Sequence, residues 1–574
     1  MAEDDISEVR KRVRDRWSQF GNEEPKRVKS SRQLNQEEII DLTSEAEETD
    51  IENATEQLSA GATDNETKES EGSPYPKARG SFKREEALDT PSFKIVKSNL
   101  YETTGASQEK FTDFTEIFSS ADLCRCWLFS FQYELDYILT MFDPRVKLTI
   151  VAQKGTILPL SVMTPKLKSL ISNMKTLLID MPPFTCHHSK LIINEYKDGG
   201  VRIYIPSNNF TSAETNLPQQ VVWSSPLLPR ESQARKSMSH FRDSLLQYLS
   251  TYDCDLSDLN ETITKTNFTK IEEYGLKFIY SSPRPAKKLF DDSGTGFRLL
   301  CNELQDFRHV KDPSNKDNQL HHYFCQVSTI GAPLTAGSSP PGNLLTHLMI
   351  PFLSGLLPAV ELQTKKRTNQ LLDWDRLAEL YKLQGIKPYI LYPTEKEIRN
   401  CTLGYMASGW FHYHRARNEC ARKVYEKLKS SGFFFKQRQE RHTSRNTTPS
   451  HTKFYAKFTT NSQNSESFNC PDWVLFTTAN LSLHAWGTAT RKPKNYEVGV
   501  LMTSSENRQL VIKNPIHSLK GNGLDETAST KKTLSILLPY ILPPEKFDDQ
   551  DDCFCISKSY SQPDALGNRH VPSQ

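Results

Sequence analysis

Short runs of branched apolar residues, separated by polar segments with helical spacing, fill the chain after about residue 91. Runs rich in Val, Ile and Leu at 146–151, 191–193 and 201–205 are typical of buried strands. In 231–249 and 413–430, apolar residues recur at three- and four-residue intervals, as on helices with one buried face. Strands that alternate with helices predict an α/β fold in which helices cover the faces of the sheets.

Polar and Pro-rich breaks divide this region, and the break at 282–287 is the best candidate for a domain boundary. We therefore predict a first domain at 91–284 and a second at 285–574. Residues 1–90 are rich in Glu, Ser, Thr, Asp and Asn and contain few aromatic residues. Such a segment cannot bury enough apolar surface to offset the entropy lost on ordering, so a disordered regulatory arm is expected there.

The overall charge conceals a strong asymmetry along the chain. The 574 residues include 72 Lys and Arg and 70 Asp and Glu, a formal net charge of +2. Residues 1–90 hold 14 of the basic and 23 of the acidic residues, a net charge of −9, which leaves +11 for residues 91–574. A basic body joined to an acidic arm favours a polyanionic partner.

Several classes of protein are disfavoured by the same composition. No window approaches 18 consecutive apolar residues, and the first twenty residues contain no apolar stretch of the signal-peptide type, so we expect no membrane association. The 11 cysteines are odd in number and scattered, with C-x-C pairs at 124–126 and 553–555 and no C-x-x-C pair. We expect reduced thiols rather than a disulfide framework, and we expect neither a metal nor a cofactor.

Two distant segments share one pattern: His-x-Lys, a strand, a turn or loop, a second strand and an Asn just past its end. The first copy supplies His188, Lys190 and Asn209, and the second supplies His451, Lys453 and Asn480. Each copy is followed by a third apolar run, which begins at Gln220 in one copy and at Glu497 in the other. One H-x-K is common by chance, but two copies with the same continuation are specific.

Spacing places these side chains together if each H-x-K lies on a strand. Residues two apart on a strand point to the same face, so His188 and Lys190 would share a face and His187 would pack on the other. The Asp-Gly-Gly turn at 198–200 would return the chain as a hairpin and bring Asn209 to the same end of the sheet. A purely structural role for the histidines is disfavoured, because each neighbouring lysine would then be a buried charge without a named partner.

Two histidines, two lysines and two asparagines form a site suited to a tetrahedral anion, most simply a phosphodiester. One imidazole can attack phosphorus and form a phosphohistidine, while the other protonates the leaving oxygen and then deprotonates water. The lysines can neutralise the phosphoryl oxygens, a task that a metal ion performs in other phosphodiesterases.

This duplicated pattern resembles the phospholipase D superfamily, and specifically the tyrosyl-DNA phosphodiesterase family, over about residues 110–570. The usual superfamily motif has an Asp five positions after the Lys, where this chain has Glu195 and Phe458. That departure fits the tyrosyl-DNA phosphodiesterase branch. Longer strings at 326–331, 478–487 and 495–500 also carry the resemblance. It implies two similar phospholipase D-like α-β-α sandwich domains related by pseudo-two-fold symmetry.

The resemblance implies a role for each matching residue. His188 corresponds to the nucleophile and His451 to the general acid and base, while the phosphate-binding residues are Lys190, Lys453, Asn209 and Asn480. Gln220 and Glu497 would support the histidines. We expect Glu497 to serve His451 and keep it protonated, and Gln220 to leave His188 uncharged. Asn208 is an alternative to its neighbour Asn209.

The resemblance also implies a substrate of single-stranded or nicked DNA whose 3′-phosphate is linked to tyrosine, as in a trapped topoisomerase I complex. Phe184 would stack on a base, with Tyr133 as a second stacking candidate. Ser328, Thr329 and Ser482 would contact the DNA backbone. Leu483 stands where relatives often have a basic residue, and the aromatic and basic run 405–417 would line the peptide side of the cleft.

The acidic arm contains two short motifs. The basic cluster 25–29 is of nuclear-import type and predicts a nuclear protein. The alternative interpretation is a solvent-exposed run of charged residues with no role in import. Ile39, Ile40 and Leu42, flanked by glutamates, resemble a SUMO-interacting motif that adds a strand to a partner sheet. We expect a monomer. The alternative functions are a related phosphodiesterase acting on lipid or ordinary DNA, and an inactive DNA-binding scaffold.

Overall fold

The computed structural model describes residues 90–572, with gaps at 102–110, 159, 162, 232–237, 288–293, 310–318, 337–338, 358–371, 438–444, 446, 462–467, 489–490 and 514–530. The expectations for the acidic arm, the import-type cluster and the SUMO-type motif therefore lie outside the described residues. Among the described helices, none has the length and apolar character needed to cross a membrane.

The first half of the chain builds an eight-stranded mixed sheet. In spatial order its strands are β2 (Phe111–Thr112), β1 (Ser92–Val96), β10 (Val221–Ser224), β9 (Val201–Pro206), β8 (Leu191–Tyr196), β3 (Leu123–Ser130), β5 (Lys147–Gln153) and β7 (Met174–Ile179). The runs predicted as strands at 146–151, 191–193 and 201–205 became β5, β8 and β9. The predicted hairpin joins β8 to β9, with Gly199 at φ 78° and the Gly200 N–H bonded to the Asp198 carboxylate at 2.9 Å.

The second half repeats this arrangement in a seven-stranded sheet. Its strands, in spatial order, are β11 (Lys277–Ser281), β21 (Glu497–Thr503), β20 (Trp473–Thr477), β19 (Phe454–Asn461), β12 (Gln319–Gln326), β16 (Ile386–Leu391) and β18 (Phe434–Phe435). The series β10-β9-β8-β3-β5 of the first sheet thus corresponds, strand for strand and with the same directions, to β21-β20-β19-β12-β16. The duplicated sequence pattern is therefore a duplicated sheet.

The predicted domain boundary at 284–285 is wrong in detail. β11 precedes that boundary, yet it pairs antiparallel with β21 as the edge strand of the second sheet. The chain therefore passes to the second sheet before its Pro-rich break. The break at 282–287 marks only the turn that follows β11, because its prolines have no N–H to donate to a ladder.

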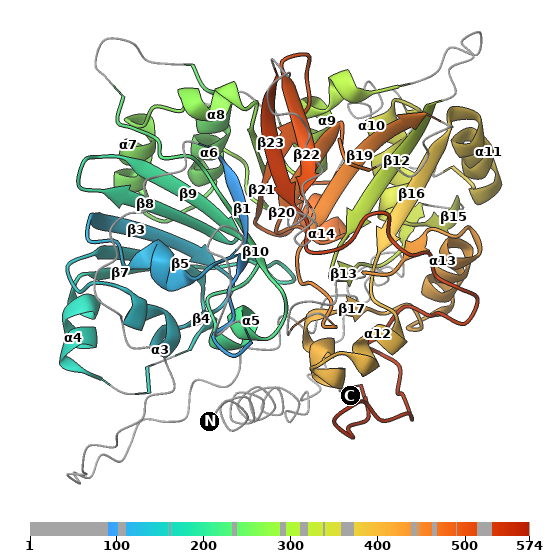
Figure 1. Cartoon of the computed structure of the whole chain (residues 1–574), viewed down its shortest axis with the longest axis horizontal. Coiled ribbons are helices and arrows are strands. Elements are labelled where there is room, and N and C mark those ends of the chain that lie inside the picture. Colours follow the sequence, from blue (N-terminus) through green and yellow to red (C-terminus); the bar gives the residue numbers. More distant parts are fainter. Residues whose placement is uncertain are drawn as a thin grey trace, which may run out of the picture.

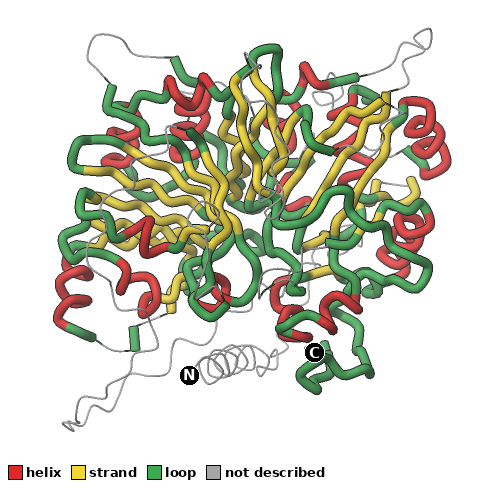
Figure 2. The backbone as a smooth tube through the Cα atoms, in the orientation of Figure 1, coloured by secondary structure: helices red, strands yellow, loops and turns green. Residues whose placement is uncertain are grey.

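Helices cover the outer sides of both sheets, and the two sheets lie side by side with their helices around them (Figures 1 and 2). The α-helices described in the first half are α2 (Phe114–Phe118), α3 (Leu135–Ile138), α4 (Pro165–Ser172), α5 (Ser212–Asn216), α6 (His240–Ser250), α7 (Ser257–Thr264) and α8 (Thr269–Glu273). Those of the second half are α9 (Phe297–Glu303), α10 (Ile350–Ser354), α11 (Trp374–Gln384), α12 (Glu395–Asn400), α13 (Glu419–Ser430) and α14 (Leu483–Trp486).

Four two-stranded pairs complete the described strands: β4 (Tyr133–Glu134) with β6 (Ile157–Leu158), β13 (Thr329–Ile330) with β17 (His412–Tyr413), β14 (Leu334–Ala336) with β15 (Ser339–Gly342), and β22 (Arg508–Lys513) with β23 (Lys532–Leu537).

Both predicted helices exist with shorter bounds. The pattern at 231–249 became α6, preceded by residues that are not described, and the pattern at 413–430 became α13. The first residues of the second pattern instead form β17 and a turn, because Asn418 caps the helix by accepting a hydrogen bond from the Ala421 N–H at 2.8 Å.

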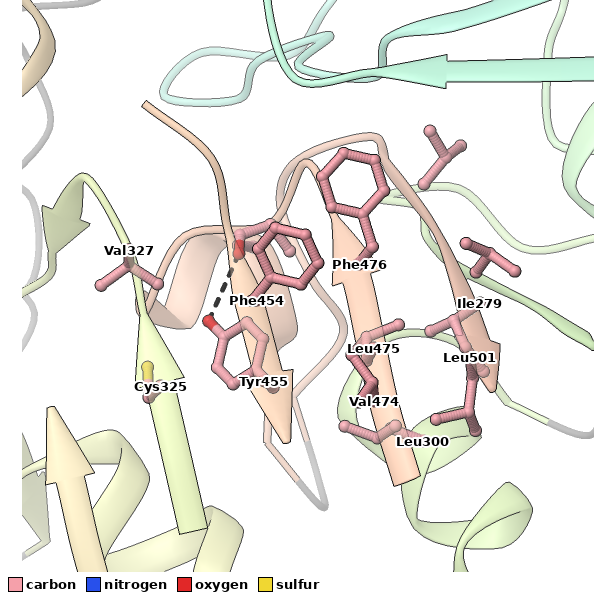
Figure 3. Close-up of a cluster of buried hydrophobic side chains, with 14 of the residues drawn as sticks. Ile279, Leu300, Cys325, Val327, Phe454, Tyr455, Val474, Leu475, Phe476 and Leu501 are labelled. Atoms are coloured by element: carbon pink, nitrogen blue, oxygen red, sulfur yellow. Dashed lines mark hydrogen bonds between the residues drawn. The ribbon is translucent and has the colours of Figure 1, made fainter. Parts of the chain in front are cut away.

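Continuous burial along the central strands, such as β9, β20 and β21, gives them two buried faces, as expected for sheets covered on both sides. On β3, Trp127 and Phe129 join a core that extends through both halves, whereas Leu128 joins a second core on the outer face of the first sheet. Figure 3 shows part of the shared core, where β19 and β20 pack Phe454 against Phe476 at a ring-centroid distance of 4.9 Å. This rigid core fixes the strand ends from which the site residues project.

Candidate active site

The two H-x-K segments lie immediately before their strands rather than on them. Lys190 is followed by β8 and Lys453 by β19. The expected shared orientation of residues two apart nevertheless appears in the contacts: the Lys190 Nζ bonds the His188 carbonyl at 3.1 Å, and the Lys453 Nζ bonds the His451 carbonyl at 3.0 Å. Each lysine therefore folds back alongside its own histidine.

The catalytic candidates are buried at the junction of the two halves. His188 and His451 are each 7% exposed, and both lysines are fully buried. Bridges between distant segments bring them together: Cys186 accepts from the Tyr496 N–H at 2.9 Å, and Gln219 accepts from the His451 N–H at 3.2 Å. The beginning of β21 thus abuts the loop before β8, and the segment before β10 abuts the loop before β19.

His187 is a packing residue, as the alternation predicted. It is fully buried, and its ring nitrogens contact the Ser130 carbonyl at 3.2 Å and the Tyr252 hydroxyl at 2.9 Å. Burial lowers the pKa of His187 to about 3, so this ring is neutral at physiological pH.

The expected pairing of Glu497 with His451 is wrong. Glu497 contacts His188 instead, with the His188 Nδ1 at 2.8 Å from Oε2 of the carboxylate, and Gln220 contacts His451, with Nε2 at 3.3 Å from Nδ1. The sequence argument paired residues within one half. The structure crosses them, because the two halves face each other. Glu497, the first residue of β21, meets His188, and Gln220, the residue just before β10, meets His451.

The carboxylate on His188 suits a nucleophile. When the Nδ1–H donates to Glu497, the lone pair is left on Nε2, and the negative charge can stabilise the cationic ring formed on phosphorylation. Thr478 donates to the same carboxylate at 2.6 Å and Asn495 at 3.3 Å. Burial raises the pKa of Glu497, but the nearby His188 and Lys190 outweigh it and hold that pKa below its usual value.

His451 lies in a different electrostatic setting. Its burial, together with the charges of Lys453 and Lys190, lowers the pKa of the ring well below its usual value. The Gln220 amide is fixed by the Ser207 hydroxyl, which donates to Oε1 at 2.7 Å, and by the Glu214 carbonyl, which accepts from Nε2 at 3.2 Å. A ring with a lowered pKa is neutral in the free protein, as a base must be to take a proton from water, and when it carries a proton it releases that proton readily to a leaving group.

The two asparagines arrive at the expected ends of β9 and β20. Asn480 is held through its Oδ1, which accepts hydrogen bonds from the Ser328 N–H, the Ser328 hydroxyl and the Thr329 N–H at 3.0–3.3 Å. The Oδ1 of Asn209 accepts from the Ser130 hydroxyl at 2.9 Å. Ser130 and Ser328 both lie at or just beyond the ends of equivalent strands, β3 and β12.

Asn208 does not share this environment. It is fully buried, and its Nδ2 donates to the Asn209 carbonyl at 3.0 Å and to the Thr215 hydroxyl at 3.1 Å. The geometry therefore matches Asn209, rather than Asn208, to Asn480.

The predicted DNA-contact residues divide into three groups. Tyr133 is fully buried and donates to the Leu128 and Val151 carbonyls at 2.8 and 2.9 Å, so it cannot stack on a base and that prediction is wrong. Phe184 is 40% exposed and has a φ of 60°, a region that bulky residues rarely adopt. Its backbone is held by a turn in which Thr185 donates to the Pro182 carbonyl, so an apolar ring is displayed four residues before His188.

The three polar candidates all lie beside Asn480. Ser328 is buried and supports the Asn480 amide, Thr329 is partly exposed, and Ser482 is buried as the N-cap of α14, with its hydroxyl accepting from the Ala485 N–H at 3.1 Å. Their contact with DNA stays a prediction. In the run 405–417, Tyr405 and Trp410 are buried in or at the end of a short 3₁₀ helix, which makes them core residues.

Several functional residues were missed by sequence reasoning. Ser130, Glu214, Thr478 and Asn495 each bond directly to a site residue. Thr478 and Asn495 lie inside the strings that carry the family resemblance, and Thr211-x-x-Glu214 has the form of a helix capping box.

Two His-Lys-Asn sets meeting between two similar α/β halves define a hydrolase of the phospholipase D superfamily. A model of the family described as tyrosyl-DNA phosphodiesterase matches residues 93–548, well over half of the chain. The chain therefore belongs to the tyrosyl-DNA phosphodiesterase family, whose name implies a role in DNA repair.

Individual relatives agree with this assignment. The chain is 38% identical over 487 residues to tyrosyl-DNA phosphodiesterase 1 of Saccharomyces cerevisiae, covering 81% of this chain and 84% of the yeast protein. It is 23% identical over 463 residues to a probable tyrosyl-DNA phosphodiesterase of Caenorhabditis elegans, covering 76% and 83% of the two chains. A crystal structure of the yeast enzyme matches with a TM-score of 0.66 and 36% identity, covering 81% of this chain and all of that one.

Proposed function

We propose that this protein hydrolyses the bond between a DNA 3′-phosphate and tyrosine through a phosphohistidine intermediate and without a metal ion. The observation that carries the proposal is the crossed pairing of His188 with Glu497, together with a buried His451 that contacts Gln220 and two buried lysines alongside. A nucleophile, an acid and two fixed cations are what this transfer requires. The substrate suggests that the protein works in the nucleus.

The reaction has two balanced steps. In the first, Nε2 of His188 attacks phosphorus, the bond from phosphorus to the tyrosyl oxygen breaks, and His451 gives its proton to that oxygen. In the second, His451 takes a proton from water, the resulting hydroxide attacks phosphorus, and the phosphorus–nitrogen bond breaks. The products are a tyrosyl peptide, a DNA 3′-phosphate and free His188, while Lys190, Lys453, Asn209 and Asn480 bind the phosphoryl oxygens throughout.

The test uses a single-stranded oligonucleotide bearing a 3′-phosphotyrosine, incubated with the whole protein in the presence of EDTA. The expected product is the 3′-phosphate oligonucleotide, separated by electrophoresis, at a rate that EDTA does not change. A matched oligonucleotide with the tyrosine on a 5′-phosphate serves as the control. Loss of activity with EDTA, or equal cleavage of both ends, contradicts the proposal.

Phe184 supports the single-stranded part of the proposal, because an exposed ring held by a strained backbone near the nucleophile is suited to base stacking. Replacing Phe184 with Ala is expected to weaken binding of a single-stranded 3′-phosphate oligonucleotide by about 1–3 kcal/mol, roughly 5- to 150-fold in Kd. Fluorescence anisotropy measures this, and Phe184→Tyr, which keeps the ring, should bind nearly as well as the wild type. An unchanged Kd for Phe184→Ala rules out stacking.

A further inference from the structure

Glu214 is a buried carboxylate whose hydrogen bonds converge on one site residue. It is 9% exposed, and its Oε2 accepts from the Asn209 N–H at 2.7 Å while its Oε1 accepts from the Asn209 Nδ2 at 2.7 Å. Both oxygens are thus used, and both face N–H donors, as an ionised carboxylate prefers. The main chain and the side chain of Asn209 are fixed by the same group.

This arrangement departs from ordinary helix capping. Glu214 is the third residue of α5, whose N-cap Thr211 accepts from the Glu214 N–H at 3.2 Å. In a complete capping box the glutamate would return this bond to the N-cap N–H. Such a box exists elsewhere in this protein, where Glu397 bonds the Thr394 N–H at 2.8 Å. In α5 the carboxylate reaches past the N-cap to Asn209 instead.

In the described part of the second half, no carboxylate occupies the position that corresponds to Glu214. Ser482 caps α14 as Thr211 caps α5, which places Ala485 at the position of Glu214. Asn480 is oriented through its Oδ1, which accepts from Ser328 and Thr329 rather than from a charged group. The two phosphate-binding asparagines are therefore oriented by different means, and only Asn209 depends on a glutamate.

Glu214 also connects Asn209 to the acid. Its main-chain carbonyl accepts from the Gln220 Nε2, which contacts His451. One short helix thereby sets the position of an amide at the phosphate and of an amide at the histidine. A substitution of the Glu214 side chain leaves its main-chain carbonyl in place. The effect of the carboxylate on Asn209 can therefore be separated from the effect of the carbonyl on Gln220.

We propose that Glu214 is a positioning residue that orients the Asn209 amide toward the substrate phosphate. This inference rests on the proposed function, since it assumes a phosphate bound by Asn209. One Nδ2 hydrogen is taken by Glu214, the Oδ1 is taken by Ser130, and the second Nδ2 hydrogen is thereby aimed at a phosphoryl oxygen. Without the carboxylate the amide can rotate, and it donates to the phosphate only part of the time.

The test compares two oligonucleotides of one sequence, ending in a 3′-phosphate or a 3′-hydroxyl, by fluorescence anisotropy with the whole protein. Glu214→Gln is expected to raise the Kd of the 3′-phosphate ligand about tenfold and to leave that of the 3′-hydroxyl ligand unchanged. A merely structural defect would weaken both. Glu397→Gln is the matched control: it removes a half-buried, hydrogen-bonded glutamate from the same position of another short helix and should leave both values unchanged.

A double-mutant cycle tests whether the effect passes through Asn209. In turnover of the 3′-phosphotyrosyl oligonucleotide, Asn209→Ala combined with Glu214→Gln is expected to be no slower than Asn209→Ala alone. Independent, multiplying effects overturn the inference, as does an unchanged 3′-phosphate Kd for Glu214→Gln. If the wild type itself does not turn over this substrate, the proposed function fails, whereas wild-type turnover with an unaffected Glu214→Gln protein rejects only the role of Glu214.

Discussion

Replacing His188 with Ala is expected to reduce cleavage of a 3′-phosphotyrosyl oligonucleotide by about 10⁴-fold or more, the scale seen when a covalent nucleophile is removed. The lysines and asparagines would still bind the phosphate, but nothing in the same place could attack it. Binding of the 3′-phosphate product should therefore change little. The measurement is the single-turnover rate at saturating enzyme, together with the anisotropy Kd of the product.

The companion variant His451→Asn should fail differently. Tyrosine is a fair leaving group with a reference pKa near 10, so attack by His188 continues at a reduced rate without an acid. Hydrolysis needs a base that Asn cannot supply, and a covalent protein–DNA adduct should accumulate. Denaturing electrophoresis detects it, and the double variant with His188→Ala should show none. If His451→Asn forms no adduct while His188→Ala keeps wild-type activity, the roles of the two histidines have been misassigned.

The site could be predicted from the sequence because the same pattern of His, Lys and Asn occurs twice in the chain. His, Lys and Asn at matched spacings in two distant segments carry information that a single copy lacks, and the second strand of each copy must bring its Asn back to the His. The structure brings both sets together as that reasoning expected, although each H-x-K lies just before β8 or β19 rather than on the strand. Strand alternation also identified His187 correctly as a packing residue.

The local pattern could not predict which histidine Glu497 and Gln220 each contact, because these contacts run between the two halves. Nothing in the local pattern states that the first residue of β21 meets His188 rather than His451, because that contact depends on how two sheets face each other. The same limit explains Tyr133. An aromatic residue near a site sequence can stack on a base or pack in a core, and only the hydrogen bonds of its hydroxyl to Leu128 and Val151 decide. Domain boundaries share the problem, since β11 joins a sheet formed mostly by later residues.

The crossed pairing makes a specific prediction for Glu497→Gln. Gln can still accept a hydrogen bond from the His188 Nδ1–H, but it cannot stabilise the positive charge that the ring acquires when Nε2 bonds to phosphorus. Removal of the negative partner of a catalytic histidine costs up to about 10⁴-fold in a serine protease. For a nucleophile that becomes cationic only after attack, we expect the single-turnover rate to fall by about 10²- to 10³-fold, with a nearly unchanged Kd for the product.

Gln220→Glu is the matched control, because it places the new charge on the other histidine. A carboxylate beside His451 should raise the lowered pKa of that ring. His451 must carry a proton in the first step, so the rate of that step falls as pH rises through this pKa, and in Gln220→Glu the fall should move to higher pH. Glu497→Gln should lower the rate of the first step at every pH, and the pH at which that rate falls should not rise. A pH profile of Glu497→Gln shifted like that of Gln220→Glu, or a rate within about threefold of the wild type, would mean that Glu497 does not act through His188.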